Sequence, residues 1–330
     1  MSQTPWRPTS GPLKNRSLVL LSGEGTTVPA AEAKALYLAY DDGSEFEEPE
    51  PRVLLAHSKA DPFVVGARIA FARRVGILLR GYEDARPILE GRRVRFRCFD
   101  LVPREDRPDP AEYLKGTDCT VDLLNPDCEL TLLRGENDYI AVTNPTGMRQ
   151  DWSSRRPRSR PFFHPSAIFP KLSRALFNLT RCKEGEVFFE PFAGTGSIAI
   201  EASIMGARVV AVDLSALMTH GALSNMKHYS QDWLGVTRAD SAHMPLRKID
   251  AVATDIPYGR ASSTQGRSPR DLLRLLLPAL ADVTKPGSRV VLMHPQDLSV
   301  VGSGDFEAEE EHHLHVHKLL TRTITVLRRS

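Results

Sequence analysis

The chain of 330 residues is long enough for two domains with separate cores, and its 41% hydrophobic and 25% charged residues are ordinary for a soluble globular protein. A formal net charge of +2 excludes a strong overall field, so a polyanionic partner would have to be met by a local basic patch. Four scattered cysteines without a C-x-x-C pair argue against a disulfide framework or a zinc site, and the lack of both a long apolar run and a signal peptide predicts a cytoplasmic protein without membrane attachment.

The first half of the chain predicts a flexible tail, residues 1–16, followed by a small α+β module, residues 17–148. The acidic, proline-containing segment 41–51 is expected to be a solvated loop. Strands are expected at 18–24, 52–58, 74–82 and 92–99, helices at 29–40 and near 62–71, and the module is completed by 119–125, 128–135 and 138–143.

Residues 149–165, "RQDWSSRRPRSRPFFHP", predict a linker that runs over the surface. Five arginines and three prolines in this span do not suit a core element. A solubilising connector would explain the charge. Because aromatic rings are interleaved with the cations, a nucleic-acid contact surface is an equally good interpretation. The candidate contacts are Arg155, Arg156, Arg158 and Arg160.

Residues 166–330 alternate between strands and helices, which predicts a parallel, doubly wound α/β sheet. The expected strands are 186–192, 208–215, 236–240, 248–255 and 288–295, and the expected helices are 170–180, 197–206, 216–229 and 269–284, the last despite Pro278. The final segments, 307–320 and 321–330, lack an intervening helix and predict an antiparallel hairpin at the edge of the sheet.

The stretch "FFEPFAGTGS", residues 188–197, has the pattern of a strand, a glycine-rich turn and a helix start. No lysine follows the glycines, so a P-loop is excluded. Acids are expected to end successive strands: Glu190 suits an ammonium group, Asp213 a ribose diol, and Asp240 an adenine amino group. A cation, a ribose and no phosphate together describe S-adenosylmethionine.

The stretch "DIPYGR" ends the next expected strand at the same edge. An exocyclic base amine is a poor nucleophile because its lone pair is delocalised into the ring. The Asp255 carboxylate and the Ile256 carbonyl would accept its hydrogens and localise that pair. Pro257 would stiffen the loop, and Tyr258 would stack on an extruded base. An ordinary turn explains the proline but not the acid.

The runs "EPFAGTGSIAIEASIMGARVVAVD" and "ATDIPYGR" resemble Rossmann-like methyltransferases that act on amino groups of nucleobases. The run "RPFFHPSAIFPKLSRALFNL" resembles the archaeal tRNA guanine-N2-methyltransferases that act at position 10 of tRNA. The resemblance is close from 160 to 260 and looser before, where "LSGE", "VDLLNPDCEL" and "ENDYIA" match the family's ferredoxin-like and THUMP segments. It implies methyl transfer from S-adenosylmethionine to the 2-amino group of a guanosine in tRNA.

The family's acid-Pro-Pro-aromatic tetrapeptide is catalytic and falls on Asp255, Ile256, Pro257 and Tyr258. Ile256 departs from the usual proline, and we expect a looser but active loop. Glu190 replaces a commoner aspartate. The full expected cofactor site is Phe163, His164, Pro165, Glu190, Pro191, Ala193, Gly194, Thr195, Gly196, Asp213, Leu214, Asp240, Ser241 and Asp255.

A THUMP-like module would make Arg92, Arg93 and Arg95 phosphate contacts, although a solvated face is the simpler interpretation of such a run. The resemblance also admits a small zinc-binding activator subunit as a partner, and it leaves open whether one or two methyl groups are added. His313, His315 and His317 would share one strand face, but an exposed strand explains them better than a metal site.

Two alternatives remain at this point. The same tetrapeptide serves methyltransferases of ribosomal RNA and of DNA adenine, but the arginine-rich segment and the THUMP-like module favour structured RNA. The other alternative is an RNA-binding protein with a degenerate methyltransferase domain, for which Ile256 is the supporting feature.

Overall fold

The computed structural model describes residues 15–24, 26–144, 150–229, 233–243, 246, 248–258, 266–298, 300, 304–317 and 320–330, with the backbone alone at 315–317 and 320. The chain divides into two compact units, one comprising Met1–Glu24 and Leu36–Gln150, the other Gly25–Ala35 and Asp151–Ser330. The predicted tail lies almost wholly outside the described residues. None of the helices in the described part of the chain is long and apolar enough to cross a membrane.

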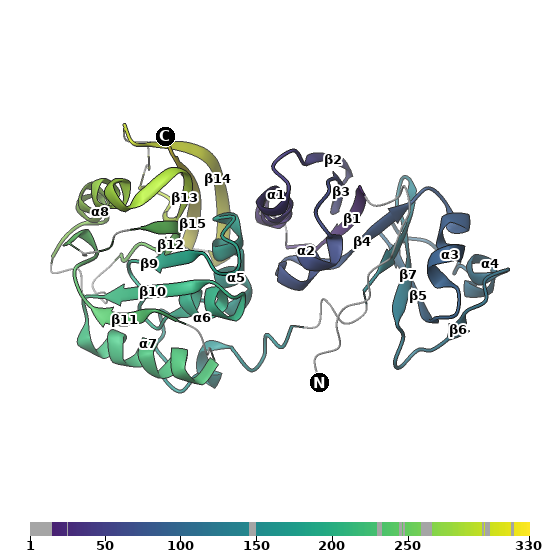
Figure 1. The fold of residues 1–330 in the computed structure, drawn as a ribbon, viewed down its shortest axis with the longest axis horizontal. Coiled ribbons are helices and arrows are strands. Elements are labelled where there is room, and N and C mark those ends of the chain that lie inside the picture. The colour runs from purple at the N-terminus through teal and green to yellow at the C-terminus, as the bar shows by residue number, and fades with distance from the viewer. Residues whose placement is uncertain are drawn as a thin grey trace. The chain divides into compact units, whose positions relative to one another are not determined.

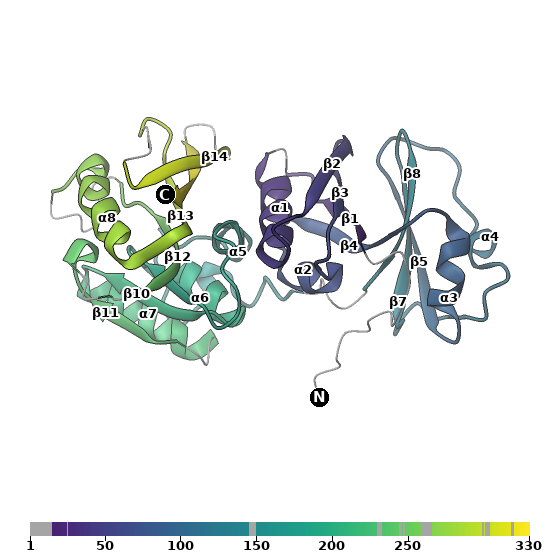
Figure 2. The same cartoon turned by 45° about the horizontal axis from the view of Figure 1, so that its top comes forward.

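The first unit is built on a mixed sheet, with β8, β7 and β5 side by side in Figure 2. Among the described residues the sheet has eight strands in the order β2-β3-β1-β4-β8-β7-β5-β6. Strand β5 runs parallel to β6 and β7, whereas the other neighbours are antiparallel. The elements up to residue 143 are β1 (Arg16–Leu21), α1 (Val28–Tyr40), β2 (Glu45–Glu50), β3 (Val53–His57), α2 (Pro62–Arg68), β4 (Ala72–Leu79), η1 (Tyr82–Ala85), α3 (Arg86–Leu89), β5 (Arg93–Asp100), α4 (Pro110–Leu114), β6 (Thr120–Val121), β7 (Cys128–Arg134) and β8 (Asp138–Thr143). Helix α1 is divided between the units, since its residues up to Ala35 belong to the second.

The solvated loop predicted for residues 41–51 is wrong, because Glu45–Glu50 forms strand β2. This strand pairs with β3 at the edge of the sheet, where Glu45, Glu47 and Glu48 remain exposed to water. Its register shifts between Glu47 and Glu50, around Pro49, a residue that strands accept at an edge. The other predicted strands and helices of this module are present, most of them with bounds that differ by a few residues, which confirms an α+β module.

The second unit contains the predicted doubly wound sheet (Figure 1). In the described part of the chain its strand order is β11-β10-β9-β12-β13-β15-β14. The first five strands in this order, β11, β10, β9, β12 and β13, are mutually parallel. The hairpin β14–β15 joins β13 through antiparallel pairing of β15, as expected. The elements are η2 (Pro157–Ser159), α5 (Pro170–Leu179), β9 (Val187–Glu190), α6 (Ser197–Ile204), β10 (Arg208–Asp213), α7 (Ala216–Tyr229), β11 (Gly235–Arg238), η3 (Ser241–His243), β12 (Ile249–Asp255), α8 (Pro269–Val283), β13 (Thr284–Pro295), β14 (Phe306–His317) and β15 (Leu320–Arg329).

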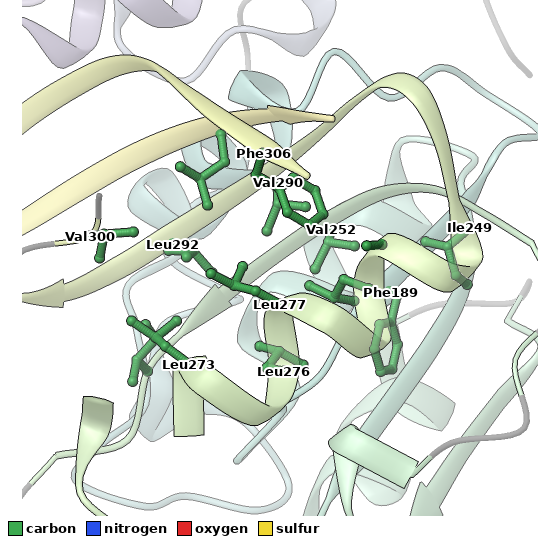
Figure 3. Packing of buried hydrophobic residues seen from close by; sticks show 14 of the residues in the cluster. Phe189, Ile249, Val252, Leu273, Leu276, Leu277, Val290, Leu292, Val300 and Phe306 are labelled. Atoms are coloured by element: carbon green, nitrogen blue, oxygen red, sulfur yellow. The ribbon is translucent and has the colours of Figure 1, made fainter. Parts of the chain in front are cut away.

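Two adjacent phenylalanines of β9 show how both faces of this sheet are covered. Phe188 packs edge-on against Phe177 of α5, with ring centroids 5.2 Å apart. Phe189 points to the opposite face, where it joins a core cluster with Val252 of β12 and Leu276 of α8 (Figure 3). Helices α5 and α8 therefore lie on opposite faces, as a doubly wound sheet requires.

Helix α8 begins with a capping box. The Ser268 hydroxyl accepts the Asp271 amide N–H, and the Asp271 carboxylate accepts the Ser268 amide N–H. Pro269 occupies the first turn, where a missing N–H costs nothing. The helix continues past Pro278, as the sequence predicted, because its apolar stripe is held in the core.

Substitutions at two neighbouring leucines of α8 test this packing. Leu276 is fully buried, whereas Leu275 is 41% exposed. We expect Leu276→Ala to lower the free energy of unfolding by about 2–5 kcal/mol through reduced burial and a residual cavity. The control, Leu275→Ala, should change it by about 0.5 kcal/mol or less. Chemical denaturation measures both, and equal effects would contradict this placement of α8.

Candidate functional site

The acids predicted to end successive strands lie at one edge of the second sheet. Glu190, Asp213 and Asp255 are the last residues of β9, β10 and β12, and Asp240 follows the end of β11. The pairing is parallel throughout, with Asp213 opposite Arg238, so these carboxyl ends share an edge. Ligands of doubly wound folds bind at this edge.

The glycine-rich turn after β9 is shaped by two residues with left-handed backbone conformations. Gly194 has φ 52° and Gly196 has φ 76°, values that favour glycine. The Asp213 carboxylate secures the turn from β10: Oδ2 accepts the Gly194 amide at 2.9 Å and Oδ1 accepts the Ser215 amide at 2.8 Å. A Cβ placed on Gly194 would meet no atom within 4 Å, so the backbone at this glycine faces open space. Pro191, Ala193 and Thr195 are buried within it.

Glu190 has a local structural task that sequence reasoning did not foresee. Its side chain is buried, and Oε2 accepts the Ala199 amide in the first turn of α6 at 2.8 Å. Burial raises the pKa of Glu190 well above its usual value, and the amide bonds of the helix start oppose the rise. Glu190 therefore ties β9 to α6, and its predicted contact with an ammonium group stays a prediction.

Asp240 is also engaged by protein groups at the same edge. Its Oδ1 accepts the Ala242 amide at 3.1 Å, and its Oδ2 accepts Arg267 Nη1 at 2.9 Å. Burial works against the charge, but these two donors hold the pKa of Asp240 below its usual value. The neighbouring Ser241 is buried, and the Leu214 carbonyl accepts Arg238 Nε at 3.0 Å.

The linker expected to run over the surface is instead partly built into the second unit. The buried Arg155 donates from Nε to Glu201 Oε1 at 2.7 Å, and the fully buried Arg174 donates to Glu201 Oε2 at 2.6 Å. The Trp152 ring lies 5.1 Å from the Arg155 guanidinium carbon and 5.7 Å from that of Arg174. A buried carboxylate of α6 therefore holds the start of this segment.

Arg160 secures the same segment to the start of α6. It is 5% exposed and donates to Ser197 Oγ at 2.6 Å and to the Ile168 carbonyl at 3.1 Å. The expectation that Arg155 and Arg160 are exposed RNA contacts is therefore wrong: both guanidinium groups bond to protein partners inside the unit. Arg156 and Arg158 are exposed.

Asn225 of α7 was missed by sequence reasoning, although it joins the two loops of the site. Its Oδ1 accepts the Phe162 amide at 2.9 Å, and its Nδ2 donates to the Phe162 and Thr195 carbonyls at 3.0 Å each. One turn earlier, a Cβ at Gly221 would collide with the Phe162 ring. A glycine and an asparagine four residues apart on one helix face were the available signal.

The segment expected to cover the cofactor follows directly. Phe163 is 45% exposed, with the Arg158 guanidinium carbon 5.9 Å from its ring centroid. His164 bonds through Nδ1 to Ser166 Oγ at 2.8 Å, and Pro165 is exposed. Asn225 and Arg160 thus present this segment beside the glycine-rich turn.

The tetrapeptide begins at the end of β12 and is firmly anchored at Ile256. The Ile256 amide donates to the Met293 carbonyl of β13 at 2.8 Å, and its side chain is fully buried in the α8 core cluster. Proline at this position could not donate that bond. The expectation of a looser loop is therefore not supported, since the isoleucine adds an anchor.

Arg322 of β15 contacts the tetrapeptide, and no sequence signal pointed to it. Its Nη1 donates to Asp255 Oδ1 at 2.5 Å, and its Nη2 lies 3.3 Å from Asp255 Oδ2 and also donates to the Tyr258 hydroxyl. The guanidinium carbon lies 3.9 Å from the Tyr258 ring centroid. Burial raises the pKa of Asp255 to about 6, and Arg322 opposes that rise.

The basic residues proposed for the first unit fall into different environments. Arg95 is buried and donates to the fully buried Glu129 at 2.7 Å, which contradicts an exposed phosphate contact. Arg93 is exposed and pairs with Asp127 at 2.7 Å. Arg92 is partly exposed and donates to the Ile88 carbonyl.

The histidines of β14 were weighed as metal ligands. His313 bonds to Thr323 at 3.2 Å, and the side chains of His315 and His317 lie outside the described residues. Within the described part of the chain, no group of three or more histidines, cysteines or acids is arranged to hold a metal ion.

Comparison with known proteins gives consistent matches. The family model described as UPF0020, RMKL-like, methyltransferase domain, matches residues 157–322. A tRNA (guanine(10)-N2)-dimethyltransferase of Methanothermobacter thermautotrophicus is 31% identical over 336 residues, covering 94% of this chain and 99% of that protein. Its namesake from Pyrococcus abyssi is 26% identical, covering 83% and 89%. The crystal structure of TrmN from Thermus thermophilus aligns with a TM-score of 0.47 and 20% identity, covering 96% of this chain and 100% of that one.

Removal of the Asn225 amide tests whether it organises the site. Asn225→Ala leaves the Phe162 and Thr195 backbone groups without their partner, at about 1–3 kcal/mol for each group that stays buried and unsatisfied. We expect a lower unfolding midpoint and weaker S-adenosylmethionine binding by about tenfold, measured by thermal denaturation and calorimetry. The exposed neighbour gives the control, Ser224→Ala, which should change neither. Unchanged binding in Asn225→Ala would separate this asparagine from the ligand site.

Proposed function

We infer the function from the family to which this chain belongs, the tRNA (guanine(10)-N2)-methyltransferases with a methyltransferase domain of the UPF0020, RMKL-like type. The chain is an S-adenosylmethionine-dependent enzyme that methylates the exocyclic 2-amino group of guanosine 10 in tRNA. The observation that carries this conclusion is the 31% identity over 94% of the chain to an archaeal enzyme of that name. The acid-Ile-Pro-Tyr loop at the ligand-binding edge of the sheet agrees with it.

The residues at that edge suit the proposed cofactor. Gly194 turns toward open space without a side chain, which allows a ligand to approach the backbone closely. The carboxylates of Asp213 and Asp240 can accept hydrogen bonds from hydroxyl and amino groups and attract a positive charge, and they repel a phosphate. Asp213 Oδ1 and Oδ2 each keep lone-pair capacity beyond their backbone bonds, which a ribose diol would use.

The remaining cofactor residues are proposed in supporting positions. Phe163, His164 and Pro165 would cover the ligand. The backbone of Pro191, Ala193, Thr195, Gly196, Leu214 and Ser241 would line the site, and Glu190 would act mainly through the loop that it ties to α6. S-adenosylmethionine, when bound there, supplies an electrophilic methyl group on a positively charged sulfur.

The tetrapeptide is proposed to prepare the amine for attack. Asp255 and the Ile256 carbonyl would accept the two amine hydrogens, so that the nitrogen lone pair points at the methyl carbon. The amine held in this way would take the methyl group that the cofactor supplies, the C–S bond breaking with its electron pair left on sulfur, and the nitrogen would release one proton to water. Tyr258 would stack on the extruded guanine, at about 1–3 kcal/mol for a base–aromatic contact.

The tRNA is proposed to be held by both units. Arg156 and Arg158 are exposed beside Phe163 and are the remaining candidates in the segment 149–165. Arg92 and Arg93 are the remaining candidates at the start of β5, in a first unit that we propose to be ferredoxin-like and THUMP-like. We also propose a cytoplasmic location, where tRNA is modified, and a small zinc-binding activator subunit as a partner to be sought by co-purification.

A direct assay tests this function. The purified protein is incubated with methyl-labelled cofactor and unmodified bulk tRNA, and the labelled nucleoside is identified and mapped. N2-methylated guanosine at position 10 is the expected product, and the number of methyl groups is read from the nucleoside itself. Label in ribosomal RNA or adenine would indicate another substrate class, and cofactor binding without transfer to any RNA would indicate a degenerate enzyme.

The role of Asp255 is tested by Asp255→Asn. The amide keeps the shape but loses the charge that draws on the amine hydrogens, so single-turnover methylation should fall about 100-fold or more. Binding of cofactor and tRNA should change little, because the interaction that is removed strengthens in the transition state. The matched control is Asp250→Asn, at the opposite end of β12, where the acid pairs with Lys285. A parental rate in Asp255→Asn removes this residue from the chemistry.

The contrast between exposed and buried arginines in the segment 149–165 gives a further prediction. Replacement of the exposed Arg156 and Arg158 by Gln should weaken tRNA binding and flatten the slope of log affinity against log salt by about 0.7–0.9 for each phosphate that is no longer neutralised. Thermal stability should be unaffected. The paired variant, with Gln at the buried Arg155 and Arg160, should instead be less stable than the parent protein. An unchanged salt slope in the first variant would make those arginines a solvated surface only.

A further inference from the structure

Arg322 touches both groups that the tetrapeptide contributes to the reaction. It bonds to the Asp255 carboxylate, it donates to the Tyr258 hydroxyl, and its guanidinium lies on the Tyr258 ring. The three residues come from β12, the loop after it and β15, with 67 positions separating Arg322 from Asp255. The contact is therefore a product of the tertiary fold.

The sheet fixes where this arginine stands. Arg322 lies opposite Pro295 of β13 and opposite Leu314 of β14, so it is paired on both sides of its strand. It is 9% exposed. A cation with so little access to water is retained where a carboxylate compensates its desolvation, and here that carboxylate is Asp255.

We propose that Arg322 is a positioning residue of the methyl-transfer site, which keeps Asp255 ionised and oriented and holds the Tyr258 ring in place for the base. This inference rests on the proposed function, because it takes Asp255 to be the acceptor for the amine hydrogens.

The two distances to Asp255 explain how one carboxylate can serve both a cation and an amine. Arg322 engages Oδ1 through Nη1, whereas the separation of 3.3 Å between Nη2 and Oδ2 is long for a charge-assisted bond. A carboxylate offers about four lone-pair sites, so an amine can bond to Oδ2 while Arg322 stays on Oδ1. Arg322 need not leave for the reaction to occur.

The charge of Arg322 is the main influence that opposes the effect of burial on the pKa of Asp255. Burial favours the neutral acid, and among the described residues Arg322 supplies the attraction that opposes it. The charge of Arg322 also acts on His294 of β13, whose pKa is lowered mainly by burial. Glu311 of β14 acts on His294. Tyr258, in the loop of Asp255 itself, has a raised pKa because of burial and stays neutral. Without Arg322, Asp255 would become protonated near neutral pH and could no longer accept the amine hydrogens.

The test reads the protonation of Asp255 directly. Protein labelled with carbon-13 at aspartate carboxyl groups is titrated by NMR, and Asp255→Asn identifies the signal. We expect a midpoint of about 6 in the parent protein. In Arg322→Met the midpoint should rise by about 1–3 pH units, the range for loss of an adjacent opposite charge. Arg322→Lys keeps a cation, so its midpoint should stay near that of the parent protein. This variant also provides a measurement if Arg322→Met does not fold.

Single-turnover methylation supplies a second readout. In Arg322→Met the acid limb of the pH–rate profile should move upward with the NMR midpoint, so that the rate at pH 7 falls about tenfold and recovers at high pH. A purely structural role would lower the rate at all pH values alike. The control is Arg328→Met, which removes a half-exposed cation of the same strand near Glu309 and should move neither quantity.

An unchanged NMR midpoint in Arg322→Met overturns this role for Arg322, even if the enzyme methylates tRNA. Conversely, a shifted midpoint in a protein that methylates no tRNA supports the charge coupling and rejects the proposed function. The two failures are therefore distinguishable.

Discussion

The site depends on the parallel pairing of β12 with β9 on one side and β13 on the other. Parallel strands end together, so this pairing brings the tetrapeptide that begins with Asp255 to the edge that also carries the glycine-rich turn and Asp213. A shift of one residue would turn Val252 out of the core and move the acid to the other face. The alternating burial of Phe188 and Phe189 on the two faces of β9 makes such a shift costly, so core packing determines the geometry of the chemistry.

Buried charges form a second layer of organisation around that edge. Glu201 binds Arg155 and Arg174, and Asp255 binds Arg322. Replacing such pairs by apolar residues often leaves stability unchanged, whereas removing one partner is strongly destabilising. Their benefit here is therefore orientation: the first cluster directs the segment that we propose to cover the ligand, and the second holds the carboxylate that we propose to accept the amine hydrogens.

Sequence reasoning succeeded where a local pattern decides the structure. The turn at Gly194 and Gly196 and the strand ends at Asp213 and Asp255 follow from residue type and periodicity. It failed where a partner that is distant in the sequence determines the environment of a side chain. Nothing near Arg160 in the chain reveals that Ser197 and Ile168 surround its guanidinium, so the segment appeared to be a solvated linker. Arg322 lies in a strand rich in β-branched residues, where one arginine looks like an ordinary surface cation.

Ile256 is a position where the local sequence pattern and the tertiary contacts give different expectations. As a departure from a family pattern it suggested a weakened loop, yet its amide extends the pairing of β12 with β13 by a bond to Met293, and its side chain fills the core beside α8. Proline in this place would stiffen the loop through its ring but would forfeit that bond. Isoleucine reaches rigidity by another route, in which strand pairing and burial restrain the backbone. The carbonyl that we propose to accept an amine hydrogen is present in either residue, so the position constrains loop geometry more strongly than side-chain identity.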